Sequence, residues 1–189
     1  NLEKPVTIAF MDKFLIRSFS PILTLGGGQI LDLNISGKWK EIKKYAINLD
    51  KRKNVKDRII YIIENQKNYP FTISKIQKRL GKSIKEITEY IQDKHNYSII
   101  KYLSFEWILT NNQILEAKRN LISTIEEFHR QNSYSRGILK NVILQKNGGD
   151  ENFLDYLISC LIDDLKLERV DEYIKIKEWE EKFDREQKI

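Results

Sequence analysis

The stretch TISKIQKRLGKSIKEI, residues 72–87, contains two short amphipathic segments separated by a glycine. Ile73, Ile76 and Leu80 recur at helical spacing and are followed by Gly81, a residue type that commonly ends helices. Ser83 then stands three residues before Glu86, which is the pattern of a capping box at a helix start. The stretch therefore predicts one helix over 73–80 and another that begins at Ser83.

The flanking sequence completes a small unit around these two helices. An apolar stripe precedes them, formed by Ile59, Ile60, Ile62 and Ile63. Two runs rich in β-branched and aromatic residues follow, Tyr97–Leu103 and Phe105–Leu109, and they predict a hairpin. Three helices closed by a β-hairpin is the order of a winged-helix domain, which we expect over residues 55–110.

The same plan recurs over residues 111–178, as in a tandem repeat of one unit. A first helix is marked by Leu121, Ile122, Ile125 and Phe128, and a second, after Gly137, by Ile138, Leu139, Val142 and Ile143. Asn147–Asp150 is a turn, and the apolar residues of 151–165 predict a third helix that includes Leu165. Val170 and Tyr173–Ile176 then predict strands.

Residues 1–35 have the character of strands, and residues 36–54 form a lysine-rich connector. Strands are expected at Thr7–Phe10, Phe14–Ile16, Ile22–Leu25 and Ile30–Leu33, with breaks at proline and glycine. In the connector, Trp39, Ile42 and Tyr45 recur three residues apart. We expect a short helix there that docks on a neighbour, with Trp39 as its anchor.

Two motifs in the first region resemble the end of the third domain of EF-Tu-like translation factors. They are DKFLIR at residues 12–17 and TLGGGQILD at residues 24–32. The Ser20-Pro21 pair between them and the triple glycine ending in Leu31-Asp32 are similar to the selenocysteine-specific elongation factors, the SelB family. Phe128-His129 followed by Gly137 resembles the start of a winged-helix repeat of that family, with Ser133-Tyr134 where the family usually has proline.

The resemblance implies an α+β chain: β-strands from the end of an EF-Tu-like domain 3 barrel, followed by two tandem winged-helix domains. The expected boundaries are 1–35 for the barrel strands, 36–54 for the connector, 55–110 and 111–178 for the two winged-helix domains, and 179–189 for a further linker. The strands of residues 1–35 are too few to close a barrel. We expect another segment of the factor to complete it; the alternatives are pairing of these strands between copies of the chain and docking on the connector around Trp39.

By the same resemblance, the intact factor delivers selenocysteinyl-tRNA to the ribosome at UGA codons under control of an mRNA hairpin, using GTP and Mg²⁺. This chain is expected to supply a spacer and an RNA-contacting arm and to need the rest of the factor as a partner. The repeat that grips the mRNA hairpin is expected to be missing from it. No Gly-x-x-x-x-Gly-Lys-Ser/Thr loop occurs, so no GTPase site, other catalytic residue or bound cofactor is expected in the chain.

Charge is concentrated in the middle of the chain. The chain carries a net charge of +6, and residues 36–110 alone carry +9. Lys75, Lys78, Arg79 and Lys82 lie at helical spacing on one basic face and are candidates for RNA phosphate contacts. The alternative is a solvated face opposite the apolar stripe. Arg17, Thr24 and Gly27 are added as RNA-binding candidates, because the resemblance places their segment near the tRNA.

Other classes of function are disfavoured. A single cysteine, Cys160, and two histidines give no zinc spacing, and His129 and Cys160 are expected in the core. No membrane partner is expected and the chain is placed in the cytoplasm, since no apolar run has the length of a membrane span. A DNA-binding regulator would read a groove with its third helices, but 151–165 is acidic and 83–94 has mixed charge. A protein-interaction module also stays open.

Overall fold

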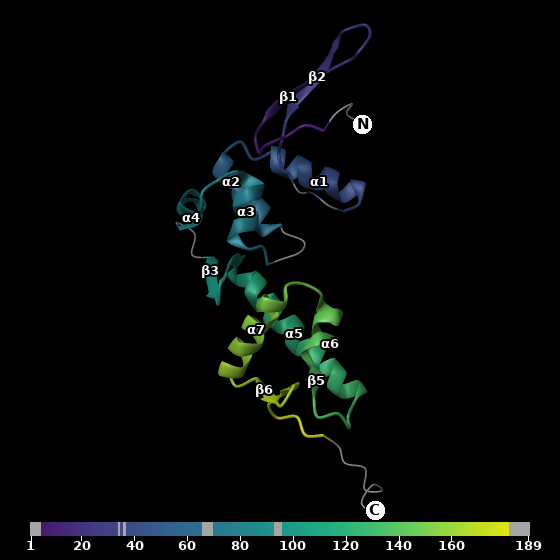
Figure 1. The fold of residues 1–189 in the computed structure, drawn as a ribbon, viewed down its shortest axis with the longest axis vertical. Coiled ribbons are helices and arrows are strands. Elements are labelled where there is room, and N and C mark those ends of the chain that lie inside the picture. Colours follow the sequence, from purple (N-terminus) through teal and green to yellow (C-terminus); the bar gives the residue numbers. More distant parts are fainter. Residues whose placement is uncertain (1–4, 34, 36, 66–69, 93–95, 182–189) are drawn as a thin grey trace, which may run out of the picture. The chain divides into compact units, whose positions relative to one another are not determined.

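The computed structural model describes residues 5–33, 35, 37–65, 70–92 and 96–181. The chain folds as two compact units. The first comprises Asn1–Lys67 with Phe71–Tyr97, and the second comprises Asn68–Pro70 with Ser98–Ile189. Helices and small antiparallel sheets occur in both, as Figure 1 shows. The predicted α+β class is confirmed.

The first unit begins with a two-stranded hairpin of β1 (Lys13–Arg17) and β2 (Thr24–Gln29). The strands are antiparallel, and the triple glycine lies inside β2 rather than in a turn. Strands predicted at Thr7–Phe10 and Ile30–Leu33 are wrong, because Asp12 N–H donates back to the Ala9 carbonyl in a turn and only Ile30 continues the hairpin, through backbone hydrogen bonds with Met11 and Asp12. Side chains of suitable composition do not make a strand without a backbone partner.

Helix α1 (Trp39–Asp50) confirms the helix predicted in the connector, but its anchor differs. Leu49 is buried, and Tyr45 packs on Tyr61 of the next helix with ring centroids 5.3 Å apart. Trp39 is 75% exposed, so the prediction that it anchors the connector is wrong. Trp39 stands at the first helical position, outside the Ile42–Tyr45–Leu49 stripe that faces inward.

The three helices predicted in the first unit are present as α2 (Val55–Glu64), α3 (Ile73–Leu80) and α4 (Ile84–Gln92). Their inner faces supply most of the apolar core of the unit. The buried members are Ile59, Ile60, Ile62, Ile63, Ile73, Ile76, Leu80, Ile87 and Ile91. The end of the predicted helix 83–94 falls partly on residues 93–95, outside the described ranges.

The start and end signals of α3 and α4 work as the sequence predicts. Thr72 Oγ1 accepts the Lys75 N–H at 3.4 Å, and Gly81 ends α3 in the left-handed conformation with φ of 59°. Before α4, Ser83 N–H donates to Glu86 Oε2 at 2.9 Å, while Glu86 N–H donates to Ser83 Oγ at 3.2 Å. This reciprocal pair is the predicted capping box.

The hairpin of β3 (Tyr97–Tyr102) and β4 (Phe105–Thr110) contributes to the core of the second unit. Ile100, Trp107 and Leu109 belong to the same buried cluster as Leu121 and Ile125. By packing, therefore, the chain does not divide at residue 110. The boundaries 55–110 and 111–178 remain a prediction about successive domains along the chain.

The rest of the second unit contains three helices and a small sheet. The helices are α5 (Asn111–Gln131), α6 (Lys140–Asn147) and α7 (Glu151–Asp163). The strands are β5 (Ile138–Leu139), β6 (Leu167–Val170) and β7 (Tyr173–Ile176), in the antiparallel order β5-β7-β6. Helix, strand, two helices and a closing hairpin form a winged-helix arrangement.

Two details of the second unit differ from the prediction. Ile138 and Leu139 were expected in a helix, but they form β5 and pair with Ile174 and Tyr173. A Cβ on Gly137 would lie 2.8 Å from the Ile174 carbonyl oxygen, so only glycine lets the two backbones approach there. Leu165 lies beyond α7 and is exposed with φ of 58°, although it was predicted to line that helix.

Candidate nucleic-acid interface

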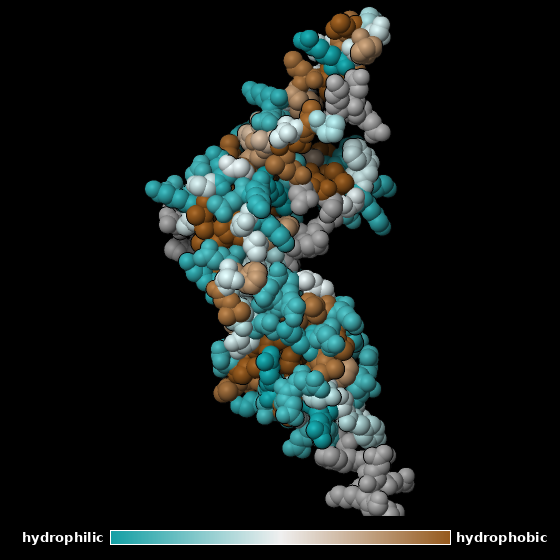
Figure 2. Space-filling model, viewed as in Figure 1, coloured by the Kyte–Doolittle hydropathy of each residue, from teal (hydrophilic) through white to brown (hydrophobic). Residues whose placement is uncertain are grey.

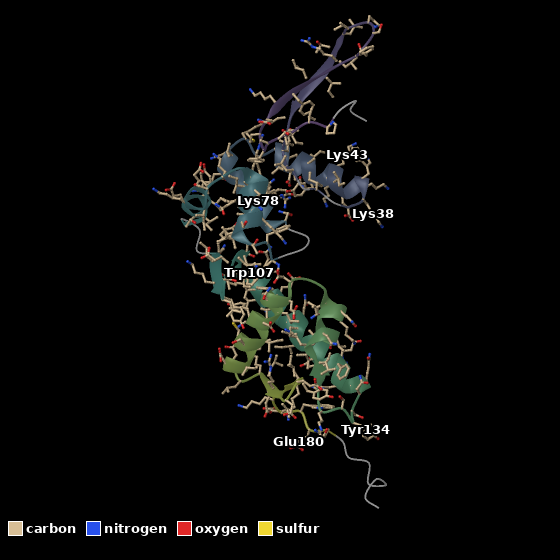
Figure 3. The ribbon with its side chains drawn as sticks, in the orientation of Figure 1. Lys38, Lys43, Lys78, Trp107, Tyr134 and Glu180 are labelled. Carbon is tan, nitrogen blue, oxygen red and sulfur yellow. The ribbon has the colours of Figure 1, made fainter. Side chains whose placement is uncertain are left out.

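Only part of the basic face predicted on α3 is available to contact a phosphate. Lys75 and Lys78 are exposed, and neither forms an ion pair among the described residues. Figure 3 labels Lys78 on this helix. The buried Ile73, Ile76 and Leu80 hold the opposite side of α3 in the core, which turns these two lysines outward. Both ammonium groups are therefore accessible to the phosphates of an RNA.

Arg79 is tied into the protein instead. Its Nε donates to Asp32 Oδ1 at 2.6 Å, and its Nη2 pairs with Asp32 Oδ2. The carboxylate also accepts a 2.6 Å hydrogen bond from the Tyr45 hydroxyl. The Asp32 side chain has no exposed surface and that of Arg79 is 12% exposed, so the guanidinium is committed to this carboxylate.

This Asp32 cluster, Asp32 with Tyr45 and Arg79, joins three parts of the first unit: the segment after β2, α1 and α3. Burial raises the pKa of Tyr45, and its hydrogen bond to Asp32 raises it further. Burial alone would lower the pKa of Arg79, but the hydrogen bond and the charge of Asp32 outweigh it and raise that pKa. Both shifts favour the neutral hydroxyl of Tyr45 and the charged guanidinium of Arg79 beside the carboxylate.

A second arginine fastens the hairpin to the helices. Arg58, which is buried in α2, donates from Nη1 to Gln29 Oε1 at 3.0 Å and from Nε to the Arg52 carbonyl at 2.6 Å. The same Nη1 lies 3.1 Å from Met11 Sδ. Arg58 and Arg79 thus act in the fold of the first unit, and neither offers a free cation.

Lys82, which is partly exposed, also forms an ion pair. Its Nζ lies 3.0 Å from Glu86 Oε1, one helical turn further along the chain. Hydrogen bonds from the Ser83 backbone and then from Lys82 lower the pKa of Glu86 to about 2. The hydrogen bond to Glu86 raises the pKa of Lys82. A surface pair of this kind is weak, so a phosphate can still compete for Lys82.

The candidates in the N-terminal hairpin lie on a separate element. Arg17 and Thr24 are register partners at one end of the β1–β2 ribbon, and both are exposed. Gly27 lies opposite Leu15, and a Cβ there would meet the Phe14 carbonyl oxygen at 2.8 Å. The close approach of two strands accounts for glycine at this position. The structure brings Arg17 and Thr24 together but places them apart in the fold from α3.

The structure exposes a set of lysines on α1 that are not among the RNA-binding residues predicted from the sequence. Lys40, Lys43, Lys44 and Lys51 are exposed along the outer side of α1, and Figure 3 labels Lys43 there with Lys38. Their spacing of three, four and seven residues was a signal in the sequence. This spacing indicates a basic stripe on the surface only once the structure shows that Ile42, Tyr45 and Leu49 face inward, opposite the lysines.

No group of three or more His, Cys, Asp or Glu in the described ranges could hold a metal ion, and no helix there is long and apolar enough to cross a membrane. His129 is buried, accepts the Ile176 N–H at 3.3 Å through Nε2, and stacks on Trp179 with centroids 4.2 Å apart. Its predicted place in the core is confirmed.

Comparison with solved structures defines the class of fold. Over 93% of its length, the chain superposes with a TM-score of 0.63 and 17% identity on a bacterial selenocysteine-specific elongation factor, EF-Sec, covering 27% of that chain. The fold is therefore that of a part of a translation elongation factor. No protein-family model matches the sequence.

Comparison of sequences points to the same proteins. The chain is 21% identical over 196 residues to the selenocysteine-specific elongation factor of Haemophilus influenzae, an alignment that covers 99% of this chain and 30% of the relative. The resemblance predicted from residues 12–17 and 24–32 is confirmed. The chain spans less than a third of the length of that relative.

Proposed function

We propose that this chain is a segment of a selenocysteine-specific elongation factor and serves there as a spacer and RNA-contacting arm. The observation that carries the proposal is the sequence match over 99% of the chain, with a similar fold over 93% of it. We further propose the division into barrel strands at 1–35, a connector at 36–54, winged-helix domains at 55–110 and 111–178, and a linker from 179.

The partners follow from the same proposal. They are selenocysteinyl-tRNA, the mRNA hairpin and the ribosome, with GTP and Mg²⁺ bound by the rest of the factor in the cytoplasm. The distribution of charge supports RNA as the partner of the first unit, because residues 1–97 carry a net charge of +9. Cations without base-reading side chains favour backbone contacts over sequence recognition.

A DNA-binding regulator is not favoured. In such a protein, a helix in the position of α7 would enter the major groove. This helix instead carries Glu151, Asp155 and Asp163, and Lys140 is already paired with two of these carboxylates, at 2.8 Å from Glu151 and 3.1 Å from Asp155. Negative charge on the reading helix opposes binding to phosphates.

The proposal is tested with a chimeric factor in a bacterial host that lacks its own. The matched segment of the Haemophilus influenzae factor is replaced by residues 1–189, and read-through of an in-frame UGA followed by the mRNA hairpin is measured. We expect selenium-dependent read-through well above that of a chimera carrying Arg79→Ala, which disrupts the Asp32 cluster. A chimera that accumulates as folded protein and gives no read-through would contradict the proposal.

A simpler observation addresses the same point. The reading frame upstream of residue 1 should encode a GTPase with a Gly-x-x-x-x-Gly-Lys-Ser/Thr loop followed by barrel-type domains. A gene that encodes no such loop in frame with residues 1–189 would count against the assignment. This outcome concerns only the assignment to the elongation factor and not any RNA-binding surface of the chain.

A further inference from the structure

Helix α1 has two faces of opposite character. Its inner face packs on α2 through Tyr45 and Leu49. Its outer face exposes Lys40, Lys43, Lys44, Ile47 and Lys51, whose spacings of three, four and seven residues place them on one side of a helix. The separation of Lys40 and Lys51 corresponds to about 16 Å along a helix, so the basic stripe is long enough for several phosphates.

These lysines are not used by the protein itself. None of the four forms an ion pair or a side-chain hydrogen bond in the described part of the chain, in contrast to Lys82 and Arg79. Glu41 is the one acidic residue in the first turn of α1, and it stands three residues before Lys44, so it borders the stripe. The four lysines outnumber Glu41 and Asp50, the two acidic residues of α1, so the stripe is a net positive surface and attracts polyanions.

Trp39 adds an aromatic surface at the start of the stripe. It lies between Lys38 and Lys40, one turn before Lys43, and is 75% exposed. The other two tryptophans are packed, Trp107 in the core and Trp179 on His129. A large exposed ring beside cations is the combination that binds unpaired nucleotides, with bases stacked on the ring and phosphates on the lysines.

Other polyanions fit this face less well. A membrane-surface helix needs a broad apolar face turned to the lipid, but the apolar face of α1 is turned into the protein. A protein groove would need apolar anchors at helical spacing, where α1 has lysines. In duplex nucleic acid the bases are already stacked inside the helix, so the exposed ring of Trp39 would have no unpaired base to stack on.

We propose that the outer face of α1 binds a single-stranded segment of RNA. Trp39 stacks on an unpaired base, and Lys40, Lys43, Lys44 and Lys51 contact the phosphates without reading the sequence. The inference rests on the proposed function only for its choice of RNA as the partner. It adds a surface on a different helix from Lys75 and Lys78, which lie on α3, and on a different element from Arg17 and Thr24, which lie on the hairpin.

The phosphate contacts are tested on the whole chain with a fluorescein-labelled, unstructured 12-nucleotide RNA. The variant K40Q/K43Q/K44Q/K51Q is compared with R119Q/R130Q/K166Q/K177Q, which removes four exposed cations from the second unit. Both variants lower the net charge equally. We expect at least tenfold weaker binding for the α1 variant and less than twofold for the control. The slope of log affinity on log salt should flatten by about 3 in the α1 variant.

The stacking contact is tested separately. Trp39→Ala should weaken binding of the single strand about tenfold and leave the salt slope unchanged, and Trp39→Phe should restore most of the affinity. The RNA should quench the tryptophan emission of the wild type but not that of Trp39→Phe. A 12-base-pair duplex of the same sequence should not respond to Trp39→Ala, because its bases are already stacked.

Several outcomes would overturn the inference. They are equal losses in the two quadruple variants, no effect of Trp39→Ala, or the same loss on the duplex. Binding to phosphatidylserine vesicles that depends on Trp39 would assign the face to a membrane instead. Read-through by the chimeric factor is measured independently, so the surface on α1 can fail while the proposed function holds, and the reverse.

Discussion

At the scale of single residues, the structure separates cations that hold the fold from cations that face solvent. Arg58 and Arg79 are buried and hydrogen-bonded, whereas Lys75 and Lys78 are exposed. A guanidinium can bind both oxygens of one carboxylate, whereas a lysine ammonium is a single point charge. This difference favours arginine for the buried ion pair and leaves lysine at the exposed positions. The Asp32 cluster uses that geometry.

Arg79→Ala should therefore destabilise the first unit strongly. It leaves the Asp32 carboxylate buried without its cation, which costs roughly 3–5 kcal/mol of unfolding free energy. Lys78→Ala, one residue earlier on the exposed side of α3, should change the free energy by less than about 0.5 kcal/mol. Urea unfolding followed by helical circular dichroism measures both. Equal stabilities of the two variants would remove Arg79 from its structural role.

We expect His129 to make the stability of the second unit dependent on pH. Burial and then the charge of Lys175 lower the pKa of this histidine, while the unfolded chain keeps a value near 6.5. Below pH 6.5 the unfolded state binds a proton that the folded state excludes. Stability is thus fully present above that pH and is lost as the pH falls, by at most about 1.4 kcal/mol per pH unit.

The measurement is urea unfolding at pH 7.5 and pH 5.5 in a Trp39→Phe background, in which both remaining tryptophans report on the second unit. His129→Gln cannot titrate, so it should lose less stability between the two pH values than the parent does. The same pH dependence in both proteins would mean that carboxylates, and not His129, govern it.

At the scale of helices and strands, the second unit depends on a close backbone contact at Gly137. A methyl group there meets the backbone of Ile174 in β7, which cannot move without breaking the β5–β7 pairing. Gly137→Ala should cost about 1–3 kcal/mol. Gly28→Ala is the control, because its methyl group meets only the end of the half-exposed Phe14 ring, which can turn away. Thermal unfolding of the two variants compares them.

The helices could be predicted from the sequence because each has an apolar stripe and a local start or end signal. Thr72, Ser83 and Gly81 act within four residues of their own position, and such signals need no knowledge of the fold. The failures have a common physical origin in distant contacts. β5 is a strand only because β7 lies beside it, and residues 7–10 are not a strand because no strand in the described part of the chain pairs with them.

The candidate site was harder to predict for the same reason. Asp32 lies 13 residues from Tyr45 and 47 from Arg79, so no local pattern links the three. Arg79 shares its helical spacing with Lys75 and Lys78, and its burial becomes visible only in the folded chain. Trp39 was assigned to the interior because tryptophan usually is packed, although its helix turns a different stripe inward.

At the scale of the whole molecule, the two units carry net charges of opposite sign. Residues 1–97 carry a net charge of +9 and residues 98–189 carry −3. A polyanion is therefore attracted to the first unit and repelled by the second. The acidic side chains of α7 add to this contrast, although the second unit has the winged-helix arrangement.

The salt dependence of RNA binding by the whole chain should report this division. Charge reversal at Lys75, Lys78 and Lys82 is expected to flatten the slope of log affinity on log salt by about 2, since each lost phosphate contact contributes about 0.7 for a single strand. Arg79 is left unchanged, because its loss would disturb the fold. Reversal of Arg119, Arg130 and Lys166 should leave the slope as it was, and an equal flattening would assign the effect to net charge alone.

The β1–β2 ribbon should govern the aggregation of the chain at high protein concentration. Phe19 is 90% exposed and Ile22 is 77% exposed, and Leu15 and Leu25 are uncovered as well. Figure 2 shows brown surface along this ribbon. Exposed apolar strands whose edges have unpaired backbone groups favour aggregation. Purified chain should precipitate at lower concentrations than a variant with Phe19→Lys and Ile22→Lys, so solubility screens belong before any attempt at crystals.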